Sequence, residues 1–279
     1  MAVRILTDSS SDLPFSMQEQ WGIDILPLRV LFGDKEYVDG RDLSREEFYT
    51  LLSEAAELPK TAQITPHEFE RAIGRYVEAG DEVVVLGISS ELSGTYASAL
   101  LAREQFPEAP VYVVDSRNVT FALALLVEIA VGLRDRGLGA EEIARTIESL
   151  RERVRLYAVI DDLKYLRMGG RLSAAGAVVG SLLGIKPIVT LADGRVESID
   201  KVRGMKAGYQ CVLERTEKDG IDTAYPVYFG HSNVPDAMRE LQAAAAVRFE
   251  LDSPRGCGIG PIVGTHAGPG CVGIAFVTK

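Results

Sequence analysis

The chain has 279 residues, 47% hydrophobic and 25% charged, which is a globular composition long enough for one large or two ordinary domains and excludes a disordered chain. Its net charge of −10 argues against nucleic acid or an anionic membrane surface as the main partner, because both favour a cationic footprint. Three cysteines (Cys211, Cys257 and Cys271) are odd in number and lack metal-ligand spacing, so we expect no metal site and a reducing cytoplasm, with their role left open.

The first half of the chain alternates short apolar runs with helical patterns. Two of these runs flank Gly33-Asp34, a pair typical of a tight turn, and predict a β-hairpin. Strands that alternate with helices at this spacing indicate a parallel sheet covered on both faces. We therefore predict an α/β fold, with a doubly wound N-terminal domain over residues 1–160 and an inserted hairpin. The predicted strands are 3–6, 26–32, 35–38, 83–88 and 111–114, with a linking strand over 155–160, and the predicted helices are 44–52, 67–78, 97–106, 121–134 and 140–153.

A small-residue turn follows the apolar run Val83–Leu86, which reads as a strand buried on both faces because it is continuous. The turn contains Ser89, Ser90, Ser93, Gly94 and Thr95. Open α/β sheets bind ligands at the carboxyl ends of their strands, so hydroxyls and free amides here predict a cradle for an anion or a carboxylate. The alternative is that Ser90 or Ser93 simply caps the next helix.

After residue 160 the pattern changes to hairpins mixed with helices, which predicts a C-terminal α+β domain over residues 161–279. A short helix should end at Gly169-Gly170. The weakly polar stretch 174–192 is interrupted by Lys186 and Pro187, so we predict no transmembrane segment, while transient membrane contact is left open. The predicted helices here are 163–168, 205–217 and 235–246, and the predicted strands are 188–191, 196–199, 226–229, 247–251 and 272–277.

Five motifs occur in order along the whole chain: TDSSSDLP at 7–14, ISSELSGTYASA at 88–99, DSRNVT at 115–120, LKYLRMGGRLS at 163–173 and THAGPG at 265–270. Together they resemble the DegV family. The resemblance implies a cytoplasmic carrier, without cofactor or catalytic activity of its own, that holds one long-chain fatty acid between two domains. It further implies that a separate ATP-dependent fatty acid kinase phosphorylates the presented carboxylate. The chain departs from the family pattern at residues 61–65, at Glu91 and in the helix after Asp115.

A fatty acid needs a dry channel for its tail and a small polar grip for its head. We expect Thr61, Ser93 and His266 to donate hydrogen bonds to the carboxylate, with Arg171 beside them. The neighbouring Gly94, Thr95, Gly169 and Gly170 complete the predicted site. Two alternatives stay open, because Thr61 could cap the helix that follows it and His266 could merely satisfy a turn. The predicted channel wall consists of Ala174, Ala175, Gly176, Ala177, Val178, Val179, Leu182, Leu183 and Ile185.

Other readings of the sequence are weaker. The exposed bases Lys201 and Arg203 are candidates for docking the kinase, or else a solvated strand end. A Ser/His hydrolase acting on an acyl ester is the main alternative function, although Ser93 lacks a G-x-S-x-G elbow and no aspartate is evidently paired with His266. A transferase with its own nucleotide is disfavoured, because the glycine-rich segment 256–260 has no P-loop lysine.

Overall fold

The first half of the molecule is built on a four-stranded parallel sheet, which confirms the predicted doubly wound sheet. The computed structural model describes residues 1–173 and 184–279. The sheet order is β2-β1-β6-β7 and every neighbouring pair is parallel. The side chains of its buried run alternate between two cores, with Val84 and Leu86 on one face and Val83 and Val85 on the other. The strands are β1 (Val3–Asp8), β2 (Ile23–Leu26), β6 (Glu82–Gly87) and β7 (Val111–Asp115).

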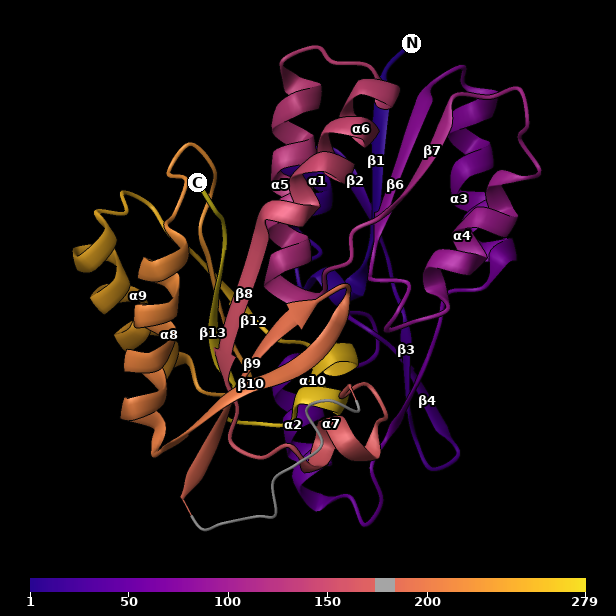
Figure 1. The fold of residues 1–279 in the computed structure, drawn as a ribbon. Helices are drawn as coiled ribbons and strands as arrows, with labels where there is room; N and C mark the ends of the chain where they lie inside the picture. Colours follow the sequence, from indigo (N-terminus) through magenta and orange to yellow (C-terminus); the bar gives the residue numbers. More distant parts are fainter. Residues whose placement is uncertain (174–183) are drawn as a thin grey trace.

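Helices cover both faces of this sheet (Figure 1). One face carries α1 (Met17–Trp21), α5 (Thr120–Asp135) and α6 (Ala140–Leu150), and the other carries α3 (Pro66–Glu78) and α4 (Thr95–Arg103). Helix α3 begins with a capping box between Thr65 and Glu68. The cap is therefore Thr65, and the alternative that assigned this role to Thr61 is wrong.

The predicted hairpin is confirmed, but its first strand begins at Arg29 instead of Leu26, which ends β2 of the parallel sheet, and the hairpin gains a third strand. Strands β3 (Arg29–Phe32) and β4 (Lys35–Val38) are antiparallel, and β5 (Lys60–Ala62) pairs with the free side of β3. The sequence had indicated only a connection at β5, because three residues carry too little pattern for a strand. Helix α2 (Arg45–Glu54) lies between β4 and β5 in the chain and starts with a capping box at Ser44.

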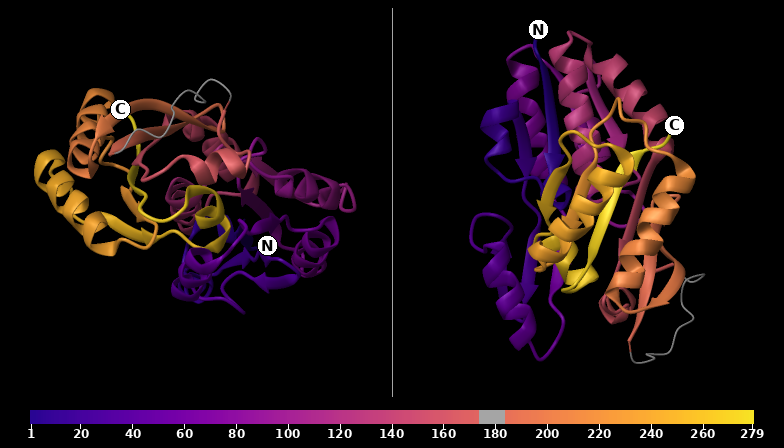
Figure 2. Two further views of the ribbon diagram at one scale, coloured as in Figure 1. Left: turned by 90° about the horizontal axis from the view of Figure 1, so that it is seen from below. Right: turned by 90° about the vertical axis from the view of Figure 1, so that its left-hand side faces the viewer.

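The second half of the chain forms a six-stranded mixed sheet in the order β10-β9-β8-β13-β11-β12. Only β11 and β12 are parallel neighbours. Helices α8 (Met205–Asp219) and α9 (Pro235–Phe249) pack on its outer face (Figures 1 and 2). The strands are β8 (Val154–Val159), β9 (Ile185–Ala192), β10 (Arg195–Arg203), β11 (Tyr228–His231), β12 (Arg255–Gly258) and β13 (Val272–Val277). Because β8 is central, this sheet begins before the predicted boundary at residue 160, and the division into two domains stays a prediction.

Two predicted elements of this half need correction. Residues 247–249 end helix α9, although a strand was expected over 247–251, and Val247 is 84% exposed on that helix. No strand was predicted in the glycine-rich segment 256–260, but it contains most of β12 and leads into α10 (Pro261–Ala267). The short helix α7 (Lys164–Met168) was predicted and ends at Gly169. Among the helices of the described residues, none is long and apolar enough to cross a membrane.

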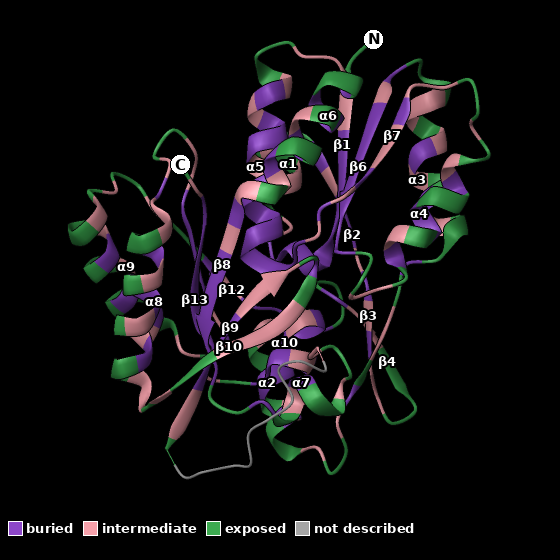
Figure 3. Cartoon of the chain, in the orientation of Figure 1, coloured by how far each residue is buried: buried purple, intermediate pink, exposed green. Residues whose placement is uncertain are grey.

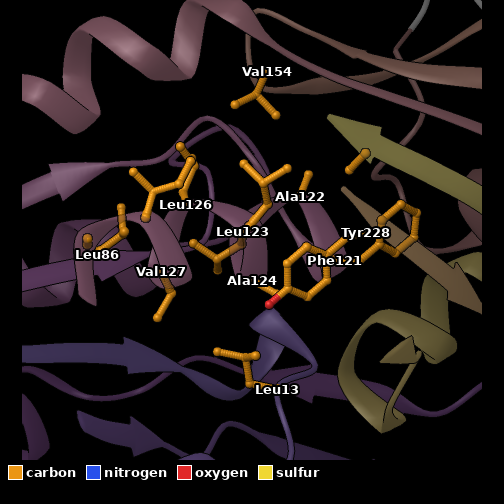
Figure 4. Packing of buried hydrophobic residues seen from close by; sticks show 14 of the residues in the cluster. Leu13, Leu86, Phe121, Ala122, Leu123, Ala124, Leu126, Val127, Val154 and Tyr228 are labelled. Atoms are coloured by element: carbon orange, nitrogen blue, oxygen red, sulfur yellow. The ribbon is translucent and has the colours of Figure 1, made fainter. Parts of the chain in front are cut away.

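Helix α5 lies between the two sheets and is buried along most of its length (Figure 3). Its side chains meet Leu86 of the first sheet and Val154 and Tyr228 of the second (Figure 4). Along β8, Val154, Leu156 and Ala158 face this core, while Tyr157 and Val159 face α8 and α9. One continuous hydrophobic core therefore joins the two halves of the molecule.

Candidate functional site

A cavity lies between the inner face of the second sheet, the start of α5 and helix α10. It has about 820 Å³ of space not filled by atoms, including its open mouth. Its wall is mainly aliphatic. The apolar lining residues are Leu28, Ile88, Leu92, Val119, Phe121, Leu156, Ala158, Ile160, Leu166, Val189, Leu191, Val196, Ile259, Ile262, Val263, Ala267 and Cys271.

Four of the predicted site residues line this cavity: Thr61, Ser93, Arg171 and His266. Thr61 Oγ1 lies 3.1 Å from His266 Nε2, although the two residues are 205 positions apart in the chain. Strand β5 brings Thr61 to this place and helix α10 brings His266. The structure thus places a polar pair, Thr61 and His266, in the lining of a mainly apolar cavity.

The imidazole of His266 is neutral at physiological pH. Burial lowers the pKa of His266 from its ordinary value of 6.5 to about 4, and the nearby positive charge of Arg171 acts in the same direction. Its Nδ1 is buried and has no hydrogen-bond partner among the described residues. A buried nitrogen without a partner is costly, so this atom is suited to contact a polar group of a ligand.

Ser93 belongs to the turn that precedes α4. Its Oγ lies 2.9 Å from Thr95 Oγ1 and accepts a hydrogen bond from the Thr95 amide at 3.2 Å. Helix α4 has Gly94 as its N-cap, and the Ser90 hydroxyl donates to Asp115 instead. Neither serine is therefore the N-cap, and the Ser93 side chain remains at the cavity wall.

The other four predicted residues are not part of the cavity lining, and two of the glycines among them permit close packing. A Cβ on Gly94 would come within 2.0 Å of Gln63 Oε1, and a Cβ on Gly169 within 2.2 Å of His266 Nδ1. Gly170 has a φ of +66° and open space around it, and Thr95 is buried at the start of α4. Gly169 thus lets the end of α7 approach the histidine ring.

Arg171 is the cation of the cavity lining. Its Nη1 donates to the Gly169 carbonyl at 2.6 Å and its Nε to the Leu92 carbonyl at 3.4 Å. The guanidinium therefore connects the end of α7 with the turn that carries Ser93. An exposed positive charge at this place would attract an anionic head group.

Asp12, a residue of the motif at 7–14, fixes the start of α10. Its carboxylate accepts hydrogen bonds from the Gly260 amide at 2.7 Å and the Thr120 hydroxyl at 2.6 Å. Complete burial raises the pKa of Asp12 to about 7, against the attraction of Arg45. Asp12 therefore connects its own turn after β1 with the starts of α5 and α10. Local sequence patterns do not reveal such long-range contacts.

The predicted channel wall over residues 174–183 lies outside the described residues. Ile185 starts β9 and does not belong to the described cavity lining. The wall that the structure describes comes instead from β8, β9 and α10. Lys201 and Arg203 are exposed on the edge strand β10.

The arrangement suits an amphipathic molecule with one small polar end. Ser93 and His266 do not form the pair expected of a hydrolase, because His266 pairs with Thr61 while Ser93 pairs with Thr95. All three cysteines are free thiols, and Cys257 and Cys271 are buried. Within the described part of the chain, no cluster of His, Cys, Asp or Glu could hold a metal ion.

Comparison with known proteins agrees with these features. A family model described as "Uncharacterised protein, DegV family" matches residues 2–279. The chain belongs to the DegV family. A DegV domain-containing protein of Caldanaerobacter subterraneus is 37% identical over 282 residues, which cover 99% of each chain.

Solved DegV structures share the whole fold. A DegV family protein of Thermus thermophilus, described by its fatty acid binding, is 31% identical, with a TM-score of 0.91 and 100% of both chains covered. A stearic acid-binding protein of Eubacterium ventriosum is 28% identical, with a TM-score of 0.88, and covers 100% of this chain and 99% of its own. Structural neighbours of this DegV chain thus bind fatty acids.

Proposed function

We propose that this protein binds one long-chain fatty acid, with the tail in the apolar cavity and the carboxylate at Thr61, Ser93 and His266. The observation that carries the proposal is the cavity itself, whose mainly aliphatic lining includes the Thr61–His266 pair. The fatty acids bound by DegV relatives support the same ligand class.

Tail and head contribute differently to this binding. Burial of a methylene is worth about 0.8 kcal/mol, so a tail of a dozen or more contributes on the order of 10 kcal/mol before ordering costs. Neutral donors on Thr61, Ser93 and His266 add less, but they decide which end of the ligand is accessible. Arg171 adds a positive charge to the cavity lining, and the proposed binding does not require an ion pair between Arg171 and the carboxylate.

The proposal extends to a carrier role. The protein would present the carboxylate to a separate ATP-dependent fatty acid kinase, which makes the acyl phosphate, and would have no turnover of its own. Because the kinase consumes ATP, the proposal assigns the protein to the cytoplasm. The exposed bases Lys201 and Arg203 on β10 are the proposed docking positions for that partner.

The mass of the lipid that co-purifies with the protein tests the ligand assignment. We expect native mass spectrometry to give a one-to-one complex, and the denatured sample to release a long-chain fatty acid. Combined Thr61→Ala and Ser93→Ala changes should lower the retained fraction, whereas Thr50→Ala, which removes an exposed hydroxyl on α2, should not. An empty wild-type protein, or unchanged retention in the double variant, would contradict the ligand or the site, respectively.

Incubation with acyl esters or with ATP tests the carrier role. We expect no hydrolysis and no acyl phosphate from the purified protein alone. Acyl phosphate should form when a fatty acid kinase is added. Release of free acid from an ester by the protein itself would favour the hydrolase instead.

A further inference from the structure

The turn of the β9–β10 hairpin contacts the turn that carries Ser93. Ser89 Oγ donates to the Gly194 carbonyl at 2.8 Å, although the two residues are 105 positions apart. Figure 1 shows the hairpin reaching across to the ends of β6 and β7. We call this contact, formed by Ser89 and Glu91 with Gly194 and Arg195, the clasp.

Gly194 fits the clasp closely. Its φ is +79°, and a Cβ there would lie 2.4 Å from Ser89 Oγ. Ser89 is completely buried. Any side chain at position 194 would therefore push the Ser89 hydroxyl away and break its hydrogen bond.

An ion pair forms the outer part of the clasp. Arg195 donates to one carboxylate oxygen of Glu91 through Nε at 2.7 Å and Nη2 at 2.5 Å. The side chains are 60% and 40% exposed, so this pair contributes less than the buried hydrogen bond and weakens with salt.

Both sides of the clasp carry residues of the cavity wall. Leu92 and Ser93 follow Glu91, while Leu191 and Val196 flank the hairpin turn. Separation of the two turns would therefore move these lining residues apart. The backbone bonds from Leu92 and Ser93 to the Ser89 carbonyl also make the position of Ser93 depend on Ser89.

We propose that the clasp holds these cavity walls together and sets the rate at which the bound fatty acid leaves. This inference rests on the proposed function. Gly194 and Ser89 are positioning residues in it, because they act through the cavity walls and the Ser93 turn.

Stopped-flow displacement of parinaric acid, a fluorescent fatty acid, by excess oleic acid measures this rate. We expect Gly194→Ala to raise the dissociation rate about fivefold or more, since a hydrogen bond of about 1 kcal/mol is lost. Gly33→Ala is the matched control: it puts the same strain at a φ of +58°, in a turn where a Cβ meets nothing within 4 Å. Its dissociation rate should equal that of the wild type.

Two further variants keep the proposal testable if Gly194→Ala does not fold. Ser89→Ala should raise the dissociation rate about fivefold, and Glu91→Gln about twofold at low salt, with no difference from wild type at high salt. Equal rates in wild type, Ser89→Ala and Gly194→Ala would overturn the clasp. A wild-type protein that does not bind parinaric acid would instead contradict the proposed function.

Discussion

His266 is placed so that protonation of its ring opposes folding. The imidazole is packed against Thr61 and the end of α7, and its pKa is about 4 instead of the ordinary 6.5. The unfolded chain therefore binds a proton at a higher pH than the folded chain does. Stability from this residue is fully present above pH 6.5 and is lost as the pH falls towards 4.

Chemical denaturation of the ligand-free protein between pH 7 and pH 4 checks this sign. We expect the wild type to lose on the order of 2 kcal/mol more unfolding free energy over this range than His266→Gln does, since glutamine keeps a hydrogen bond but does not titrate there. Asp12, whose pKa is raised to about 7, acts in the opposite direction in both proteins and cancels in the difference. A difference between the two proteins that does not change with pH would refute the assignment.

The individual residues of the site were predictable by type, but their contacts were not. The sequence identified Thr61 and His266 as polar residues beside small ones, and their 3.1 Å contact depends on two elements from opposite ends of the chain. The role of Asp12 was not predictable, because its partners Gly260 and Thr120 are 248 and 108 positions away in the sequence. No local pattern reports such contacts.

At the scale of elements, α5 contributes most to the shared core. Leu123 is completely buried on this helix, whereas Leu101 on α4 is 53% exposed. We expect Leu123→Ala to lower the unfolding free energy by about 2–5 kcal/mol, because it leaves a cavity in a packed core. Leu101→Ala, the same chemical change at an exposed site, should cost less than about 1 kcal/mol. Urea denaturation compares the two, and equal losses would contradict the central position of α5.

Elements with a clear period were predicted, whereas the short strands β5 and β12 were not. Helix α5 was readable as an apolar run and α3 by its amphipathic pattern. Strand β12 has two glycines in four residues and no alternation of apolar and polar side chains, so its sequence does not indicate a strand. The run Val247–Leu251 has strand-like residues, but the helix continues to Phe249, and Arg248 in its last turn pairs with Glu217 of α8.

At the scale of the molecule, the length of the cavity should set ligand preference. Each methylene buried adds about 0.8 kcal/mol, so affinity should rise about fourfold per carbon until the cavity is full. Isothermal titration with saturated acids of increasing length measures this series. We expect a steep rise that ends in a plateau or a fall at the longest acids. Affinity that does not depend on chain length would contradict tail burial in the cavity.

The overall arrangement was only partly predictable from sequence. Alternating strands and helices predicted the parallel sheet, because this pattern has few three-dimensional solutions. The place of β8 was not predictable, since a short apolar strand pairs equally well with either sheet by its own pattern. Pairing with β9 and β13 places β8 in the second sheet.

Helix α5 packs against Leu86 on one side and against Val154 and Tyr228 on the other, so we expect both halves of the protein to unfold together on heating or proteolysis. Neither half has a complete interior without that helix, so neither can persist as a folded remnant when the other melts. Fatty acid binding should accordingly be lost in a single step on heating, because both walls of the cavity depend on helix α5.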